Sequence, residues 1–167
     1  MPANRSSEKP LRTGEKDPVS FCLYSGLPDF PAIQIGGVLP MMQALVARYQ
    51  SGVEHLLAQE SVPEWSFVEA EIEWADAIDR AWSPISHLNA VADAPNLREV
   101  YNEGLDLLTS HQTWRSQHRG IYHAYQGLRC SETFQRLSPQ QQRIINLELR
   151  DFHLAGVDLE DAAREDY

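Results

Sequence analysis

The chain has very little cysteine. Among its 167 residues only Cys22 and Cys130 occur, and no Cys-x-x-Cys spacing is present. Two cysteines this far apart in sequence supply neither a disulfide framework nor the ligands of a cysteine-rich zinc site. Because disulfides are typical of secreted proteins, this composition favours a reducing compartment, and we expect a cytoplasmic protein.

Long apolar runs are also missing. The longest one, residues 38–47, contains Pro40 and Gln43 and is too short to span a bilayer. Basic side chains occur near the N-terminus, but no apolar segment follows them, so the sequence shows no signal peptide. We therefore predict no membrane-spanning segment.

Positive charge is outnumbered by negative charge. The chain contains 14 Lys and Arg residues and 24 Asp and Glu residues, which gives a formal net charge of −10. A surface with this excess repels the phosphates of nucleic acids and of anionic lipids. We therefore expect neither nucleic acid nor a membrane as a partner.

Hydrophobic residues, by contrast, are sufficient for one compact domain. They make up 43% of the chain and include four Trp and six Tyr. A chain of this length buries roughly 70% of its extended surface on folding. Apolar residues recur every three or four positions, and no stretch alternates with a period of two. The sequence predicts an all-α fold, an antiparallel bundle of about five to six helices.

The predicted organisation along the chain has four parts. Residues 1–18 are polar and proline-rich and form a disordered tail, and residues 19–37 form an extended lead-in. Residues 38–157 form the helical domain. Residues 158–167 begin like one more helix, with a capping Asp and acidic residues in the first turn, and the sequence stops before that helix is finished.

Two helices begin the domain, and prolines mark their ends. The first apolar stripe is Val38, Met42, Leu45, Tyr49, Val53 and Leu56, and the second is Trp65, Val68, Ile72, Ala75, Ile78 and Trp82. Pro40 is placed in the first turn of the first helix, where a missing N–H is tolerated. The segment Ser61-Val62-Pro63-Glu64 fits a capping box before the second helix. Ser83-Pro84 is predicted to end the second helix and to begin the next.

Further signals place the later helices. The next two stripes are Leu97, Tyr101 and Leu108, after the punctuation at Asp93 and Pro95, and then Trp114, His118, Ile121, Tyr125 and Leu128. Ser138-Pro139-Gln140-Gln141 predicts a capped start of the last long helix. Gly156 predicts its end in a left-handed turn.

The six histidines lack the spacing of a metal site. A zincin needs two His residues four apart on a helix with a Glu between them, and here each His is followed by Leu, Gln, Arg or Ala. The Glu-x-x-His pairs of a di-iron bundle are absent too. His111 and His118 share a predicted helical face, but the helix rise between them is about 10 Å. We predict no metal site and no cofactor in this chain.

Other reactive residue types also lack the pattern of a catalytic site. The members of one predicted solvated acidic face are Glu69, Glu73, Asp76 and Arg80. Ser86 and His87 are adjacent, and neighbouring residues of a helix do not face each other. Gly36-Gly37 is predicted to be a loop pair before a helix and does not fit a phosphate-binding loop. We therefore predict no catalytic residue.

Short blocks of sequence after residue 26 are similar, in the same order, to one known family. The blocks are Leu27-Pro28-Asp29-Phe30, Pro40, Trp65, Ser83-Pro84-Ile85-Ser86-His87-Leu88-Asn89, Leu97-Arg98-Glu99, Tyr101, Leu107-Leu108, Trp114, Gln117-His118, Gly120-Ile121-Tyr122, Ala124-Tyr125, Leu149-Arg150-Asp151-Phe152, Leu154 and Gly156. With these blocks the chain resembles the N-terminal helical region of the oligopeptidase A / thimet oligopeptidase family of zinc metallopeptidases.

The resemblance implies a function that this chain does not complete alone. In the family, this region begins one of two lobes beside a channel that admits short peptides, and the zinc ligands and general base lie further along a chain several times longer. No His-Glu-x-x-His motif occurs in these 167 residues, so no catalytic residue is carried over. The resemblance therefore implies a non-catalytic N-terminal segment of a metalloendopeptidase, inactive by itself, with zinc and short peptides bound only by a full-length member.

Two kinds of partner follow from this interpretation. The first is the C-terminal peptidase portion, and the second is another copy of the chain, bound through an exposed apolar face. A different class of protein stays open as the alternative: a stand-alone helical module for protein interaction or dimerisation, without enzymatic activity.

Overall fold

The computed structural model of the protein describes residues 28–59, 63–92 and 94–159. It contains a short 3-10 helix, Phe30–Ala32, and six α-helices, and no strand occurs within these ranges. The helices are α1 (Ile35–Leu57), α2 (Trp65–Val91), α3 (Pro95–Ser116), α4 (Arg119–Cys130), α5 (Glu132–Arg136) and α6 (Pro139–Leu154). The predicted all-α fold is confirmed.

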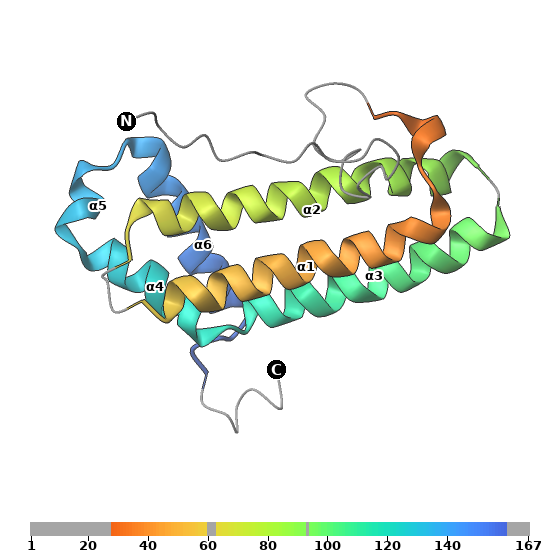
Figure 1. The fold of residues 1–167 in the computed structure, drawn as a ribbon. Coiled ribbons are helices and arrows are strands. Elements are labelled where there is room, and N and C mark those ends of the chain that lie inside the picture. The colour runs from red at the N-terminus through yellow and green to blue at the C-terminus, as the bar shows by residue number, and fades with distance from the viewer. Residues whose placement is uncertain (1–27, 60–62, 93, 160–167) are drawn as a thin grey trace, which may run out of the picture.

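The long helices α1, α2 and α3 lie side by side, and α2 runs antiparallel to the other two (Figure 1). The shorter helices α4, α5 and α6 gather at one end of this layer, beside the C-terminal end of α1. There α4 packs on α6 and also contacts α1. One hydrophobic core runs through both groups, because side chains of all six α-helices contribute to it.

Both ends of α6 form as the sequence predicts. The Ser138 hydroxyl accepts a hydrogen bond from Gln141 N at 3.3 Å, and the Gln141 side chain accepts one from Ser138 N at 2.9 Å. At the other end Gly156 has a φ of 75°. Gly156 N donates to His153 O at 3.0 Å and Val157 N to Phe152 O at 3.3 Å, which is the Schellman pattern. The predicted capping box and left-handed glycine are both confirmed.

The predicted roles of two prolines are wrong. Helix α1 begins at Ile35, so Gly36 and Gly37 are helical and Pro40 lies inside the helix instead of in its first turn. The reason is that Ile35 packs on the core, which stabilises an additional turn before the proline. Helix α2 likewise continues through Pro84 as far as Val91.

Burial explains why Pro84 does not end its helix. A proline inside a helix removes one hydrogen bond and costs about 3 kcal/mol. Pro84 and Ile85 are both buried, so the packing of this face offsets that cost. The segment therefore stays helical across a residue that commonly ends a helix.

The predicted stripe from Trp114 to Leu128 crosses a helix boundary. Helix α3 ends at Ser116, and His118 is the N-cap of α4, where its Nδ1 accepts a hydrogen bond from Ile121 N at 3.2 Å. A side chain that satisfies a free N–H at a helix start favours a break at that point. The apolar spacing continues across the break because both helices face the same core.

Some predictions fall on residues that the structure does not describe. They are the tail 1–18, most of the lead-in 19–37, Ser61 and Val62 of the predicted capping box, Asp93, and residues 160–167 of the predicted last helix. Within the described ranges, α2 has Glu64 as its N-cap without a side-chain capping bond.

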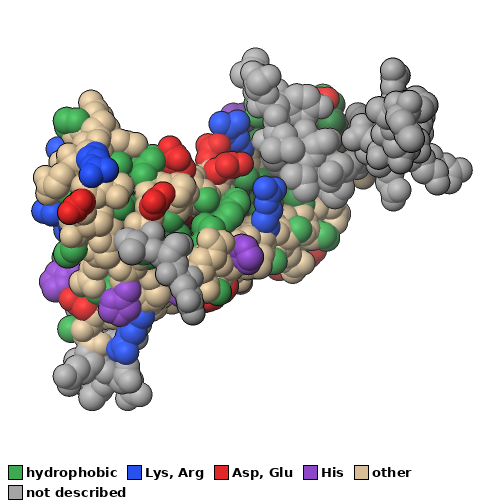
Figure 2. All heavy atoms as spheres, turned by 60° about the vertical axis from the view of Figure 1, so that its left-hand side comes forward, with side chains coloured by type: hydrophobic (Ala, Val, Ile, Leu, Met, Phe, Trp, Pro, Cys, Tyr) green, Lys and Arg blue, Asp and Glu red, His purple; other side chains and the backbone are tan. Residues whose placement is uncertain are grey.

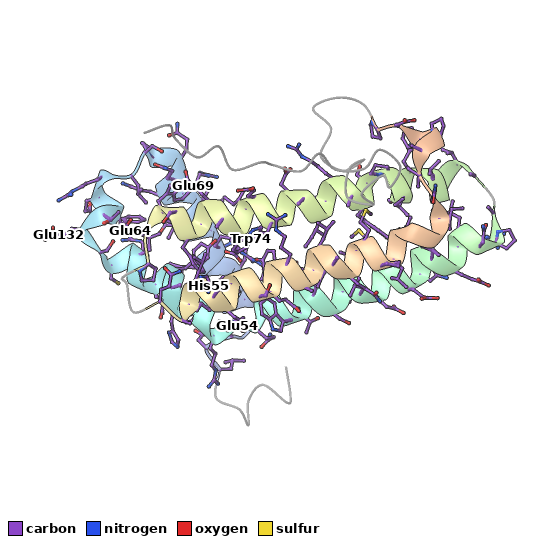
Figure 3. The ribbon with its side chains drawn as sticks, in the orientation of Figure 1. Glu54, His55, Glu64, Glu69, Trp74 and Glu132 are labelled. Atoms are coloured by element: carbon purple, nitrogen blue, oxygen red, sulfur yellow. The ribbon has the colours of Figure 1, made fainter. Side chains whose placement is uncertain are left out.

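Two tryptophans of α2 lie directly against glycines of the neighbouring helices. Trp74 lies between α2 and α1 (Figure 3), and a Cβ placed at Gly52 would come within 2.5 Å of its ring. A Cβ at Gly104 of α3 would come equally close to the ring of Trp82, at 2.5 Å. These two contacts set how closely α1 and α3 approach α2.

Replacing Gly104 with alanine tests this contact. Alanine favours a helix over glycine by about 1 kcal/mol, but the added methyl group collides with Trp82, and overpacking of this kind costs about 1–3 kcal/mol. We expect Gly104→Ala to lower the free energy of unfolding in urea. The matched control is Gly127→Ala in α4, where the nearest atom would be 3.9 Å away, and it should raise the free energy. Equal gains in both variants would contradict the contact.

Candidate functional site

A carboxylate lies in the interior of the bundle. Glu71 of α2 is only 2% exposed. The hydroxyl of Tyr125 donates to its Oε2 at 2.6 Å, and the Nε of Arg115 donates to its Oε1 at 2.7 Å. The hydroxyl of Tyr49 also donates to Oε1. Three donors, one of them charged, thus replace the water that this carboxylate loses on folding.

Arg115 of α3 joins this carboxylate to the second group of helices. Its Nη2 donates to Glu148 Oε2 of α6 at 2.8 Å, and its Nε lies 3.0 Å from the Tyr49 hydroxyl oxygen. Its guanidinium carbon lies 5.2 Å from the centre of the Phe152 ring. We call Tyr49, Glu71, Arg115, Tyr125 and Glu148 the buried polar cluster. Each member comes from a different helix.

The two tyrosines and the arginine of the cluster keep their protons around neutral pH. Burial and the nearby Glu71 charge raise the pKa of Tyr49 and of Tyr125 above the ordinary tyrosine value, so both stay neutral donors. Burial alone lowers the pKa of Arg115, but the charges of Glu71 and Glu148 outweigh it and raise that pKa. The cluster is therefore suited to hold helices together, and these three groups do not exchange protons near pH 7.

An open pocket of about 570 Å³ lies beside the cluster, between α2 and α3. His111 lines it and is 8% exposed, and its Nδ1 has no hydrogen-bond partner. The ring stacks on Trp114 at 6.0 Å between centroids and meets Tyr49 edge-on at 4.6 Å. Burial and the charge of Arg115 lower the pKa of His111, with a smaller opposing effect of Glu71. The imidazole is therefore neutral at pH 7.

The predicted acidic face of α2 is confirmed, but it is not the site. Glu69, Glu73 and Asp76 are exposed, and Asp76 pairs with Arg80 at 2.7 Å. The second apolar stripe needs a correction, because Ile72 is 46% exposed and Glu71 takes its place inside. The sequence does contain the signal, since Glu71 lies three residues after Val68 and four before Ala75, at core spacing.

The histidines do not come together. Those at the surface are His55, His87, His123 and His153. His118 pairs with Glu54 at 2.9 Å. His111 and His118 do not share a helix face as predicted, because α3 ends between them, and both of their rings contact Trp114. Among the described residues, no group of three or more His, Cys, Asp or Glu could hold a metal ion, so these residues do not fit a zinc site.

The remaining candidates lie at separate places. Ser86 and His87 are consecutive residues of α2, and the His87 ring lies against Phe30 at 5.5 Å. Cys130 is exposed at the end of α4, and Cys22 lies outside the described ranges. Of the helices described, none combines the length and the apolar character that crossing a membrane requires.

Together, the fold and the cluster define an all-α helical domain in which a buried carboxylate is paired with a partly buried arginine. A model of the family "Neurolysin/Thimet oligopeptidase, N-terminal domain" matches residues 42–164. The chain belongs to this family, as the resemblance in sequence predicts.

Curated relatives carry the same family relationship. Oligopeptidase A of Haemophilus influenzae is 37% identical over 142 residues, which cover 85% of this chain and 21% of that protein. Oligopeptidase A of Salmonella typhimurium is 36% identical, with 84% and 21% covered. The probable cytosolic oligopeptidase A of Arabidopsis thaliana is 30% identical, with 84% and 20% covered. The chain thus spans about a fifth of the length of these relatives.

The lowered pKa of His111 predicts how stability changes with pH. The unfolded chain binds a proton at this residue more tightly than the folded chain does. The free energy of unfolding is therefore undiminished by His111 above about pH 6.5, and it falls as the pH drops below that value. We expect the free energy of unfolding, measured in urea, to fall less steeply below about pH 6.5 in His111→Phe than in the unchanged chain. Phenylalanine keeps an aromatic ring between Tyr49 and Trp114.

The exposed His55 supplies the control. His55→Gln removes a histidine from the surface and leaves the buried imidazole in place. If the free energy of unfolding of His111→Phe falls with pH as steeply as that of His55→Gln and of the unchanged chain, the inferred lowering of the His111 pKa is wrong.

Proposed function

We propose that this chain is the N-terminal, non-catalytic segment of an oligopeptidase A-like zinc metalloendopeptidase that hydrolyses short peptides. The single observation that carries the proposal is the family match over residues 42–164, together with relatives named oligopeptidase A of which this chain spans only about a fifth. Peptide hydrolysis is then a property of the assembled enzyme, and this chain supplies part of its helical wall.

The proposal assigns the zinc and the catalytic groups to the other four-fifths of such an enzyme. The absence of a His-Glu-x-x-His motif from all 167 residues supports this assignment. The buried polar cluster supports a structural role, because its donors and acceptors are bonded to one another. Such an arrangement holds helices in fixed positions.

The proposal includes a cytoplasmic location for the enzyme. Two relatives from Arabidopsis thaliana, each 30% identical to this chain, differ in the location that their names give. One is a probable cytosolic oligopeptidase A, and the other is an organellar oligopeptidase A of chloroplasts and mitochondria. The low cysteine content and the net charge of −10 are compatible with a reducing, soluble compartment.

The alternative is a stand-alone module that binds a protein partner or a second copy of itself. It is favoured by large apolar side chains that stay exposed on the described surface, namely Ile72, Val91, Leu105 and Leu154. Analytical ultracentrifugation separates the two proposals in part, because a stable dimer of the purified chain would support the module.

Reconstitution tests the leading proposal. The chain is mixed with the part of Haemophilus influenzae oligopeptidase A that lies beyond the matched region, and cleavage of a short fluorogenic peptide is followed with and without a chelator. We expect no cleavage by either part alone and chelator-sensitive cleavage by the mixture. The positive control is the matched region of the Haemophilus protein in place of this chain.

Three results would contradict the proposal. The first is chelator-sensitive cleavage by the purified chain alone, and the second is one zinc ion held tightly per molecule. The third is an inactive mixture under conditions in which the Haemophilus control is active, which would favour the stand-alone module.

A further inference from the structure

The pocket between α2 and α3 has an apolar wall that faces outward. Ile72 and Ala75 of α2 and Leu108 of α3 line it, and Ile72 is 46% exposed. A large apolar side chain exposed at the mouth of a concave surface is a feature of contact sites. Hydrophobic and acidic side chains lie next to one another on the face that Figure 2 shows.

One residue that lines the pocket has a buried polar atom without a partner. His111 lines the pocket and is only 8% exposed, and its Nδ1 has no hydrogen-bond partner. A buried nitrogen without a partner costs free energy, and a donor brought from outside recovers that cost. An ammonium or guanidinium group is such a donor for the tautomer that carries its proton on Nε2.

The charges around the pocket select for a cation. Three carboxylates line it, those of Glu71, Asp79 and Glu148, against the single guanidinium of Arg115. Two negative charges are therefore in excess. Glu71 already accepts three hydrogen bonds, so Asp79 and Glu148 are the carboxylates that a cation would meet.

We propose that this pocket is the docking site for a segment of the peptidase portion that carries a lysine or arginine between apolar side chains. The basic group enters toward Glu148, Asp79 and His111 Nδ1, and the apolar neighbours cover Ile72, Ala75 and Leu108. The occupant is chosen by charge complementarity and by the fact that relatives are about five times longer than the region they share with this chain. The inference rests on the proposed function.

Site-specific photo-crosslinking tests the location. A benzoylphenylalanine is placed at Ile72, and in a control chain at Glu132, which is 96% exposed on α5, outside the layer of long helices (Figure 3). Each chain is mixed with the remaining part of Haemophilus influenzae oligopeptidase A and irradiated. We expect position 72 to crosslink to the peptidase portion at least fivefold more than position 132, and the attached peptide to contain a Lys or Arg.

A charge reversal tests the chemistry without disturbing the buried polar cluster. Asp79→Arg should weaken association with the peptidase portion about tenfold at low salt, and high salt should reduce the difference. Glu73→Arg, on the solvated face of the same helix, is the matched control and should change association less than twofold. Unchanged urea midpoints confirm that both variants fold.

The results distinguish this inference from the proposed function. If the mixture cleaves peptide but position 72 crosslinks no more than position 132, the docking site is wrong and the proposed function stands. Crosslinks from position 72 only to a second copy of this chain also overturn it. If the peptidase portion does not associate at all while the Haemophilus control does, both proposals fall.

Discussion

The ion pair between Glu71 and Arg115 is the interaction on which the arrangement of the helices depends. The Glu71 side chain is buried, where an unpaired charge would cost several kcal/mol, and the Arg115 side chain is 20% exposed. The further hydrogen-bond partners of the pair come from three other helices: Tyr49 from α1, Tyr125 from α4 and Glu148 from α6. The three long helices and the shorter group at their end are thereby held in one register.

This constraint separates two regions of the molecule by their chemistry. In the buried polar cluster, side chains of five helices are bonded to one another. The raised pKa values of its tyrosines and arginine keep these three groups protonated. The adjoining pocket is open, and apolar side chains, excess negative charge and His111, whose buried Nδ1 has no partner, line it. These two regions are compatible with the proposed role as a non-catalytic part of a larger peptidase.

The sequence predicted much of the fold because helix periodicity and capping are local. The apolar stripes gave the helical class, and Ser138 and Gly156 fixed both ends of α6. The predictions at Pro40 and Pro84 were wrong because each proline is a local signal for a helix boundary. The burial of neighbouring side chains stabilises the helix across both positions and outweighs that signal. Packing of Ile35 and Ile85 is a tertiary property that spacing alone does not contain.

The candidate site could be predicted only in part. The position of Glu71 between Val68 and Ala75 contains the signal of a buried carboxylate, although Ile72 was assigned to the core in its place. Its partners were beyond local reasoning, because Arg115 is 44 residues away and Tyr125 is 54 residues away in sequence. Nothing in the spacing of either residue indicates that α3 and α4 bring them to the same carboxylate of α2.

A double-mutant cycle on Glu71 and Arg115 tests the central claim most directly. The free energy of unfolding is measured for Glu71→Gln, for Arg115→Met and for the double variant. The account predicts a coupling energy of about 2 kcal/mol or more, because each single variant leaves the other group buried with fewer partners. Single effects that add to within about 0.5 kcal/mol would contradict it, since the two side chains would then stabilise the bundle independently.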